Sequence, residues 1–377
     1  MDIQLMKCYA KTGKVLYVNS IVMRTFNVHE GKMFLRRVRR KLLSILRGVK
    51  ASGIANMMVY SPFTMPVHHI SIARELNEIA LRLQVRRCIH KLKMNKDIIW
   101  VACPGAAAAA LKLPHEKLVY QRSDRYEEFP GVDSKQIRRC DQLLKEHADL
   151  VIYVNRELLV QEKAECRKAI FLGHGVDYEV FANANGNQYV PEEMKQIPRP
   201  IIGFYGGLDE HTTDIPLIAK IADLLRNLSI VVIGSSNVDL SVLSSRKNVH
   251  LLQQKTYEQI PHYGKCFDAA IMPWRQNRWI EACNPIKLKE YLALGKPVIS
   301  TPFPELEEYN DIVYVAKTPE TFAECVKRAL EEDCSERVAA RRRRVQDSSW
   351  DSKAELVLSQ LFPESITSRA KSGARAS

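Results

Sequence analysis

A lysine and a glutamate stand three residues apart in the segment NPIKLKEYLALGKPVIS, residues 284–300. Side chains three apart lie on the same face of a helix, so Lys287 and Glu290 are neighbours if the segment is helical. Near a helix N-terminus the ammonium group can neutralise a diphosphate. A carboxylate one turn later can accept two hydroxyl hydrogen bonds from a ribose. The alternative is a solvated salt bridge with no ligand.

The same segment carries start and stop signals for a short helix. Asn284 suits the N-cap, and Pro285 suits the first helical position, where its missing N–H costs no hydrogen bond. Gly295 suits the position just after the helix, and Pro297 prevents continuation. We therefore predict a helix over residues 285–294.

Two adjacent glycines, Gly206 and Gly207, follow the apolar run IIGFY at 201–205. Glycine lets the backbone approach a ligand closely, and successive N–H groups can face a phosphate. A plain tight turn explains the pair equally well. The chain lacks the G-x-G-x-x-G pattern of dinucleotide-binding proteins, which counts against a nicotinamide enzyme.

Short apolar runs alternate with helical patterns along the whole chain. Continuous apolar strands with helices between them indicate parallel sheets covered on both faces, as in doubly wound α/β domains. The expected strands lie at 15–19, 57–60, 98–102, 117–121, 150–154, 169–172, 201–205, 229–234, 249–252, 268–272, 297–300 and 312–316.

A polar, Asn- and Pro-rich segment interrupts this alternation and predicts a linker between two domains. We expect an N-terminal domain over 1–182, the linker at 183–199 and a C-terminal domain over 200–346. A helix over 347–362 is expected to cross back to the N-terminal domain, and a disordered tail over 363–377 follows. Two such domains facing a cleft can hold one ligand from each side.

The positive charge of the chain is concentrated at its beginning. Nineteen of the 56 Lys and Arg residues but only five of the 43 Asp and Glu residues lie in the first hundred positions. The densest part, Met33 to Lys50, has apolar residues at helical spacing with arginines between them. It is either a core-facing helix with a solvated basic side or a helix that docks on an anionic membrane surface. Nucleic acid is disfavoured, because few aromatics accompany the charges.

Composition otherwise indicates a cytoplasmic protein. The nine cysteines are scattered, with no C-x-x-C pair and no zinc-type cluster. No apolar run approaches the length of a membrane span, and the first residues lack the apolar core of a secretory signal. Peripheral attachment at the inner membrane face remains compatible with the basic segment.

The opening segment, preceded by AIMPWRQNRW, resembles the nucleotide-binding segment of GT-B glycosyltransferases, most closely the bacterial family 4-like group (glycosyl transferases group 1). There the pattern is N-P-x-K-x-x-E-Y-L-A-x-G-K-P-V after a strand and a loop. The resemblance runs from about residue 14 to about residue 360. It includes the segments VLYVNSIVMRTFN, VYQRSDRYEEFPG, LLKEHADLVIYVNRELLVQEK and FLGHGVDYEVF.

The resemblance implies roles for several residues. Glu290 would bind the ribose of a nucleotide-sugar donor, and Lys287 would contact its diphosphate. Gly206 and Gly207 would line the phosphates, and Arg275 would add positive charge. Many relatives carry two glutamates eight positions apart, but Ala282 occupies the earlier position here, with Glu281 beside it. This departure leaves the contacts to the sugar open.

The same resemblance bears on catalysis. An inverting transfer needs a base to deprotonate the acceptor hydroxyl. Asp124, in QRSDRYEEF, is the candidate; its alternative is a helix cap or a salt bridge in the loop. His174, in GHGVD, is a second candidate, against a structural role. His68 and His69 are candidates for the acceptor side. No Asp-x-Asp metal motif stands at a strand end, and the resembled fold needs no metal or other cofactor.

The sequence therefore predicts a glycosyltransferase that uses a UDP- or GDP-sugar donor. The acceptor would be a hydroxyl of a glycan or lipid-linked glycan, as in cell-surface polysaccharide biosynthesis. A nucleotide-sugar epimerase of the same two-domain build is the alternative enzyme, and a basic nucleic-acid-binding protein is the alternative without an activity. The sugar, the base, the acceptor and the stereochemical outcome are left open.

Overall fold

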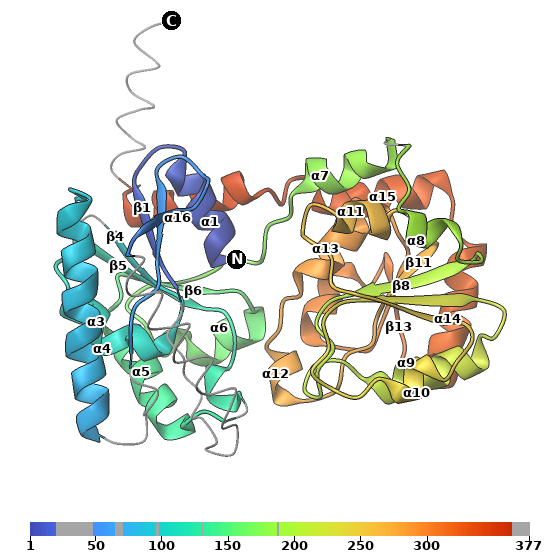
Figure 1. The fold of residues 1–377 in the computed structure, drawn as a ribbon, viewed down its shortest axis with the longest axis horizontal. Helices are drawn as coiled ribbons and strands as arrows, with labels where there is room; N and C mark the ends of the chain where they lie inside the picture. The colour runs from blue at the N-terminus through green and yellow to red at the C-terminus, as the bar shows by residue number, and fades with distance from the viewer. Residues whose placement is uncertain (20–47, 65–70, 96–97, 130, 187, 364–377) are drawn as a thin grey trace, which may run out of the picture. The chain divides into compact units, whose positions relative to one another are not determined.

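The structure is a computed structural model that describes residues 1–19, 48–64, 71–95, 98–129, 131–186 and 188–363. The chain falls into two compact units (Figure 1). One consists of Met1–Gly173 together with Trp350–Ser377, and the other is His174–Ser349.

The described part of the first unit contains two sheets. In one, β1 (Val15–Val18) pairs in parallel with β3 (Met57–Tyr60), which pairs antiparallel with β2 (Lys50–Ala51). The other sheet is parallel throughout. Its strands follow chain order: β4 (Ile98–Val101), β5 (Lys117–Arg122), β6 (Leu150–Tyr153) and β7 (Ala169–Phe171).

Helices and short 3-10 turns connect these strands. They are α1 (Asp2–Ala10), α3 (Ser71–Lys91), η2 (Pro104–Ala106), α4 (Ala107–Leu111), η3 (Tyr126–Glu128), α5 (Ser134–His147), α6 (Arg156–Glu162) and η4 (Lys163–Glu165). The last helix of the chain, α16 (Trp350–Leu361), also belongs here. Its buried residues Trp350, Ala354, Val357 and Leu361 recur at helical spacing. Lys11 Nζ lies 2.5 Å from Asp351 Oδ1, which ties α16 to the end of α1.

A network of buried charges links the end of β5 to η3, α5 and α6. The Arg122 guanidinium contacts the carboxylates of Glu127 at 3.0 Å, Glu162 at 3.2 Å and Asp141 at 3.3 Å. Lys145 Nζ lies 2.7 Å from Asp141 and 2.5 Å from Glu162. Burial alone would raise the pKa values of Glu127 and Glu162, but the Arg122 cation holds both below their usual values. Removing one cation would therefore leave carboxylates buried without compensation.

The second unit is built on one parallel sheet of six strands. Its order is β10 (Val249–Leu252), β9 (Ser229–Ile233), β8 (Ile201–Tyr205), β11 (Ala269–Met272), β12 (Val298–Ser300) and β13 (Val313–Val315). In chain order within this unit that is 3-2-1-4-5-6, the order of Rossmann dinucleotide-binding sheets. The prediction of doubly wound parallel sheets is confirmed.

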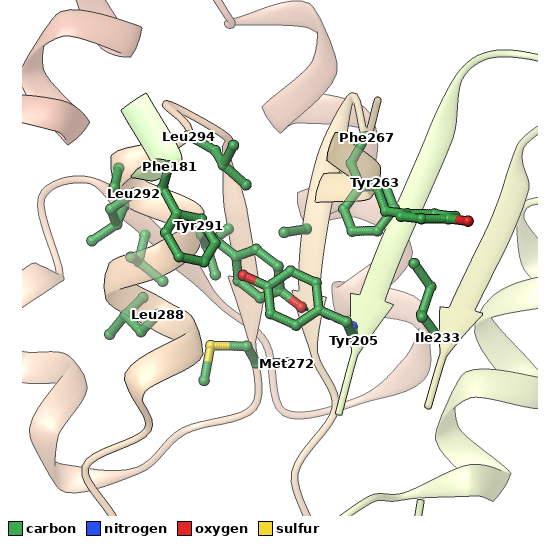
Figure 2. Packing of buried hydrophobic residues seen from close by; sticks show 14 of the residues in the cluster. Phe181, Tyr205, Ile233, Tyr263, Phe267, Met272, Leu288, Tyr291, Leu292 and Leu294 are labelled. Atoms are coloured by element: carbon green, nitrogen blue, oxygen red, sulfur yellow. Dashed lines mark hydrogen bonds between the residues drawn. The ribbon is translucent and has the colours of Figure 1, made fainter. Parts of the chain in front are cut away.

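Helices cover both faces of this sheet. They are α7 (Tyr178–Asn183), η5 (Ala184–Gly186), α8 (Glu192–Lys195), α9 (Ile215–Leu224), α10 (Ser241–Ser244), α11 (Ile260–Gly264), α12 (Arg278–Glu281), α13 (Ile286–Ala293), η6 (Pro304–Tyr309), α14 (Pro319–Glu331) and α15 (Ser335–Gln346). Successive residues of β8 serve opposite faces. Tyr205 joins a core with α13, drawn in Figure 2, whereas Phe204 joins a core with α9 and α14.

The boundaries of the units differ from the predicted ones. The segment expected as a linker, 183–199, lies inside the second unit, which begins at His174. Ala184, Met194 and Ile197 are buried in its core and hold the segment there. These three apolar anchors are widely spaced among polar residues, so their periodicity does not stand out.

Several predictions concern residues that the structure does not describe. The basic segment Met33 to Lys50 lies outside the described residues up to position 47, and so do His68 and His69. The tail is described only as far as Pro363. Among the described helices, none has both the length and the apolar character needed to cross a membrane. All nine cysteines fall in the described parts, as free thiols.

Candidate nucleotide site

Strands β8 and β11 are neighbours in the sheet. On one side of this pair the strands β8, β9 and β10 follow one another outward, and on the other side β11, β12 and β13 do so in the opposite direction. Ligands of open α/β sheets bind at such a switch point, beyond the carboxyl ends of the strands. Gly206 follows β8 directly, and Arg275 lies three positions after β11. The fold therefore brings these two predicted residues to the position where a ligand is expected.

Gly206 is confined by its neighbours. Its N–H donates to the carbonyl of Ile233 over 2.9 Å, and its φ of +155° is one that residues with a side chain rarely adopt. A Cβ on Gly206 would collide with Cε of Lys287. A Cβ on Gly234, the residue after β9, would collide with the carbonyl oxygen of Gly206. Two glycines thus allow the ends of β8 and β9 to approach each other beneath Lys287.

Lys287 lies over Gly206 at the beginning of α13. Its Nζ is 5.5 Å from the centroid of the Trp274 ring, which follows β11. Burial lowers the pKa of Lys287, and the nearby Glu290 opposes this shift. No ion pair within 4.0 Å joins Lys287 to a carboxylate of the described residues. The solvated salt bridge with Glu290 is therefore absent, and a partly desolvated cation remains at the switch point.

Glu290 is almost fully buried one turn further along α13. Burial raises the pKa of its carboxyl to about 7; Lys287 and Tyr205 oppose the shift, and Asp177 adds to it. The hydroxyl of Tyr205 lies beside this carboxyl but makes no well-formed hydrogen bond to any described residue. A buried acid and a buried hydroxyl without full hydrogen bonding indicate room for a polar ligand group.

Tyr291 fixes the helix that carries Lys287 and Glu290. Its hydroxyl accepts a hydrogen bond of 3.0 Å from the N–H of Tyr205, and the centroids of the two rings are 4.6 Å apart. Figure 2 shows both rings between the sheet and α13, with Leu288 and Leu292 on the same helix. The core thus holds α13 against β8, and the two polar side chains keep a fixed distance from Gly206.

The ends of α13 agree with the prediction in part. Gly295 has a φ of +79° directly after the helix, and its N–H donates to the carbonyl of Leu292, as predicted for its position. The predicted N-cap was wrong: Pro285 occupies the cap, and Asn284 instead donates to Glu305 over 3.2 Å. An Asn side chain with a carboxylate in reach is drawn away from the helix end.

The loop after Gly207 packs against the loop that carries Arg275. Asp209 accepts hydrogen bonds from the N–H groups of His211 and Thr212, and Arg275 N–H donates to the carbonyl of Thr212 over 2.9 Å. The Nε of Arg275 is buried and has no hydrogen-bond partner among the described residues. A Cβ on Gly207 would meet almost nothing. The site therefore offers open backbone and an unused guanidinium N–H.

Comparison with known proteins finds a family model that matches most of the second unit. Residues 199–332 match the family Glycosyl transferases group 1. TuaH of Bacillus subtilis (strain 168), named as a teichuronic acid biosynthesis glycosyltransferase, is 26% identical over 224 residues. The match covers 55% of this chain and 55% of TuaH, so the chain spans about half the length of this relative.

Solved glycosyltransferase structures share the fold. Sucrose-phosphate synthase from Thermosynechococcus elongatus superposes with a TM-score of 0.69 at 14% identity, over 97% of this chain and 92% of that one. Anabaena HepE, in complex with UDP and glucose, has a TM-score of 0.62 at 14% identity, over 93% and 99%. The predicted GT-B fold is thereby confirmed.

His174, the second catalytic candidate, is the first residue of the second unit. Its carbonyl accepts a hydrogen bond from Nζ of Lys289, a buried residue of α13. Burial lowers the pKa of the imidazole well below its usual value, and Lys289 and Lys287 lower it further. The ring is therefore neutral at pH 7, and the segment that begins at His174 is tied to α13.

Asp124, the candidate base, lies in the first unit, in the loop after β5. Arg122 Nη1 donates to the backbone carbonyl of Asp124 over 2.8 Å, and the N–H of Tyr126 donates to the same oxygen over 3.0 Å. The buried charge network around Arg122 thus holds the loop by its backbone. Nearby, Arg125 Nη2 donates to Gln161 Oε1 over 2.6 Å.

A cavity of about 400 Å³ in the second unit lies apart from Lys287 and Glu290. Glu281, Asn277 and Phe303 are among the residues that line it. Neither Lys287 nor Glu290 lines it. Among the described residues, no cluster of three or more His, Cys, Asp or Glu could hold a metal ion.

Sequence reasoning missed several residues that shape the site. Gly234 ends the run SIVVIG, and a glycine at a strand end was a signal that could have been used. Tyr291 stands next to Glu290 in the quoted segment, but nothing in the spacing reveals that its hydroxyl reaches β8. Lys289 was not singled out in the sequence, although it is buried and donates to the carbonyl of His174.

Proposed function

We propose that this protein is a glycosyltransferase that binds a nucleotide-sugar donor on its second unit and transfers the sugar to a hydroxyl group. One observation carries the proposal: Lys287 lies over Gly206 at the switch point, without a carboxylate within 4.0 Å, one turn from the buried Glu290. A diphosphate supplies the missing counter-charge, and a ribose supplies hydroxyls for the carboxylate.

The relatives support this assignment and favour UDP. The matched family and TuaH are both named for glycosyl transfer, which favours transfer over epimerisation. HepE has been solved with UDP and with UDP-glucose. We propose a UDP-sugar as the donor, with a GDP-sugar as the alternative, and a glycan or lipid-linked glycan of cell-surface polysaccharide as the acceptor.

The residues of the second unit would help the leaving group depart. As the bond from the anomeric carbon to the diphosphate oxygen breaks, negative charge collects on the diphosphate. Lys287, Arg275 and the N–H groups near Gly206 and Gly207 would balance that charge in place of a metal ion. Glu290 would hold the ribose and so fix the diphosphate against the lysine.

Asp124 is proposed as the base of an inverting transfer. It would take the proton of the acceptor hydroxyl while the oxygen attacks the anomeric carbon. Asp124→Asn should lower kcat by about a hundredfold or more and leave the Kd of UDP unchanged; Glu157→Gln, on the surface of the same unit, is the control. Retention of the anomeric configuration in the product, determined by NMR, would exclude this role.

The transferase assignment is tested with a panel of UDP- and GDP-sugars and oligosaccharide acceptors, with release of the nucleoside diphosphate as the readout. We expect release that depends on the acceptor. Formation of an epimer without an acceptor would instead establish the epimerase. Retention on DNA that nucleotides do not affect would establish the nucleic-acid-binding alternative.

We further propose that the protein works at the inner membrane face, with the basic segment Met33 to Lys50 on anionic lipid. The support is the charge of that segment; the lipid-linked acceptor proposed above would lie at the same face. Substituting Arg36, Arg39 and Arg40 should lower activity on a lipid-linked acceptor but not on a soluble one. Equal activity on both acceptors would remove the membrane from the proposal.

A further inference from the structure

Helix α3 (Ser71–Lys91) of the first unit presents an unusual surface. Four large aliphatic side chains on it are between 43% and 68% exposed: Ile72, Leu76, Ile79 and Leu83. Their spacing of four, three and four residues places them in one stripe along the helix, about 17 Å long. Figure 1 shows α3 at an outer edge of its unit. A continuous apolar stripe on the surface indicates a partner rather than chance exposure.

The stripe leads into a group of cations at the C-terminal end of the helix. Arg86 and Arg87 are exposed and lie three and four residues after Leu83, so they continue the same face. Arg82 and Lys91 flank them. Among the described residues, no acidic side chain lies within 4.0 Å of these four cations. Their charges therefore remain available to an external partner.

The few acidic residues of α3 leave this face cationic. Glu78 is occupied by Lys112, whose Nζ lies 2.5 Å from its carboxylate. Glu75 lies at the edge of the stripe near its N-terminal end. A face with aliphatic residues along most of its length and free arginines at one end suits the boundary between lipid headgroups and acyl chains. It suits a second copy of itself less well, because each copy would bring four cations into the interface against one acid of the helix, Glu75, that Lys112 does not occupy.

We propose that α3 docks on an anionic membrane surface, with Ile72, Leu76, Ile79 and Leu83 in the lipid and Arg86 and Arg87 at the headgroups. This inference adds to the proposed attachment at the membrane and rests on that part of the proposed function, not on the donor site. It assigns membrane contact to a described helix in addition to the basic segment. The stripe supplies affinity for the bilayer, and the arginines supply the preference for acidic lipid.

The test is co-sedimentation of the full chain with vesicles of phosphatidylcholine, with and without 30 mol% phosphatidylglycerol. Replacing Ile72, Leu76, Ile79 and Leu83 by Gln should lower the partition coefficient at least tenfold on both vesicle types. Val160→Gln, an equally exposed aliphatic on α6 of the same unit, should change it less than twofold. The segment Met33 to Lys50 stays unchanged in every variant, so its contribution is constant.

A second variant tests the charges. Arg86→Glu with Arg87→Glu should lower binding to the acidic vesicles about tenfold or more, since each basic residue near an acidic surface contributes about fivefold. Binding to pure phosphatidylcholine should change little. Lys135→Glu with Arg139→Glu makes the same change in net charge on α5. If the two double variants lower vesicle binding equally, the lipid responds only to the net charge of the protein, and the proposed contact through Arg86 and Arg87 is wrong.

Further outcomes would overturn the inference in favour of another occupant. If the glutamine variant binds vesicles as the wild type does but changes a dimer into a monomer in light scattering, the stripe is an interface between copies. If it instead lowers the Tm by several degrees, another segment of the chain covers the stripe. UDP binding is measured on the same variants. If a variant loses vesicle binding but still binds UDP, the change affects the membrane contact of α3 and leaves the proposed donor site untouched.

Discussion

The Glu290 carboxyl is a buried acid whose pKa is about 7 in the unliganded protein, against 4.5 for an exposed glutamate. Between these two values the folded chain binds more protons than the unfolded one. Stability therefore falls as the pH rises from about 4.5 to about 7 and stays level above that. The site retains an acid that costs stability, as expected when the group serves a ligand.

Glu290→Gln should therefore stabilise the unliganded protein. At pH 8 we expect a gain of roughly 1–3 kcal/mol in the free energy of unfolding, because the buried charge is gone. At pH 4.5 most of the gain should vanish, since the folded wild-type carboxyl is then protonated and the unfolded one is about half protonated. Urea unfolding of both proteins across this pH range measures the difference. A constant difference at every pH would contradict the raised pKa.

Lys287 is the proposed contact to the diphosphate. Lys287→Met should raise the Kd of UDP about tenfold or more, because a hydrogen bond to a charged group contributes roughly 1.5–3 kcal/mol. The affinity for uridine, which lacks phosphates, should not change. Lys220→Met, on the exposed side of α9, is the control. An equal loss for UDP and uridine would mean that Lys287 only supports the fold.

The ends of β8 and β9 form the floor of the site, and two glycines there differ in their surroundings. Gly234→Ala places a methyl group against the Gly206 carbonyl, so we expect a loss of at least ~2 kcal/mol in stability. Gly207→Ala meets open space and should change stability by less than ~0.5 kcal/mol. Thermal unfolding compares the two.

Gly207→Ala also reports on the ligand. If a phosphate lies against the Gly207 backbone, the new methyl group should weaken UDP binding about tenfold without a change in Tm. Unchanged binding would show that the phosphates lie elsewhere along the loop.

Elements with strong local signals were predictable, and elements fixed by distant contacts were not. The twelve expected strands correspond to observed strands because each is an apolar run bounded by polar or turn residues. The end of α13 was predictable because Gly295 and Pro297 act locally. Its beginning was not, since Asn284 binds Glu305, twenty-one positions away. The buried network of Arg122 and Lys145 was equally invisible, because its acids come from three different elements.

The candidate site shows the same division. Lys287 and Glu290 could be named from the sequence, because their spacing on a helix is a local property. That the pair forms no salt bridge could not be foreseen. It follows from the packing of Tyr291 against β8, which sets where each side chain points.

The whole chain consists of two units, and α16 joins the first although it comes last in sequence. Trp350→Ala removes a buried ring from α16 and should destabilise the first unit by roughly 3–5 kcal/mol. Leu356→Ala, at an exposed position of the same helix, is the control. Calorimetric unfolding should then show the first unit melting earlier, while UDP still raises the transition of the second. If the protein instead unfolds in a single transition, and Trp350→Ala and UDP both shift its temperature, the division into two separately melting units would be wrong.

The central claim is that the second unit binds a nucleoside diphosphate through Lys287 and Glu290, and calorimetric titration with UDP and GDP at pH 8 tests it most directly. The wild type should bind one of them at one site per chain. Glu290→Gln, although more stable, should bind it about tenfold more weakly or worse. If the wild type binds neither nucleotide, or if the variant binds as tightly as the wild type, the proposed donor site is wrong.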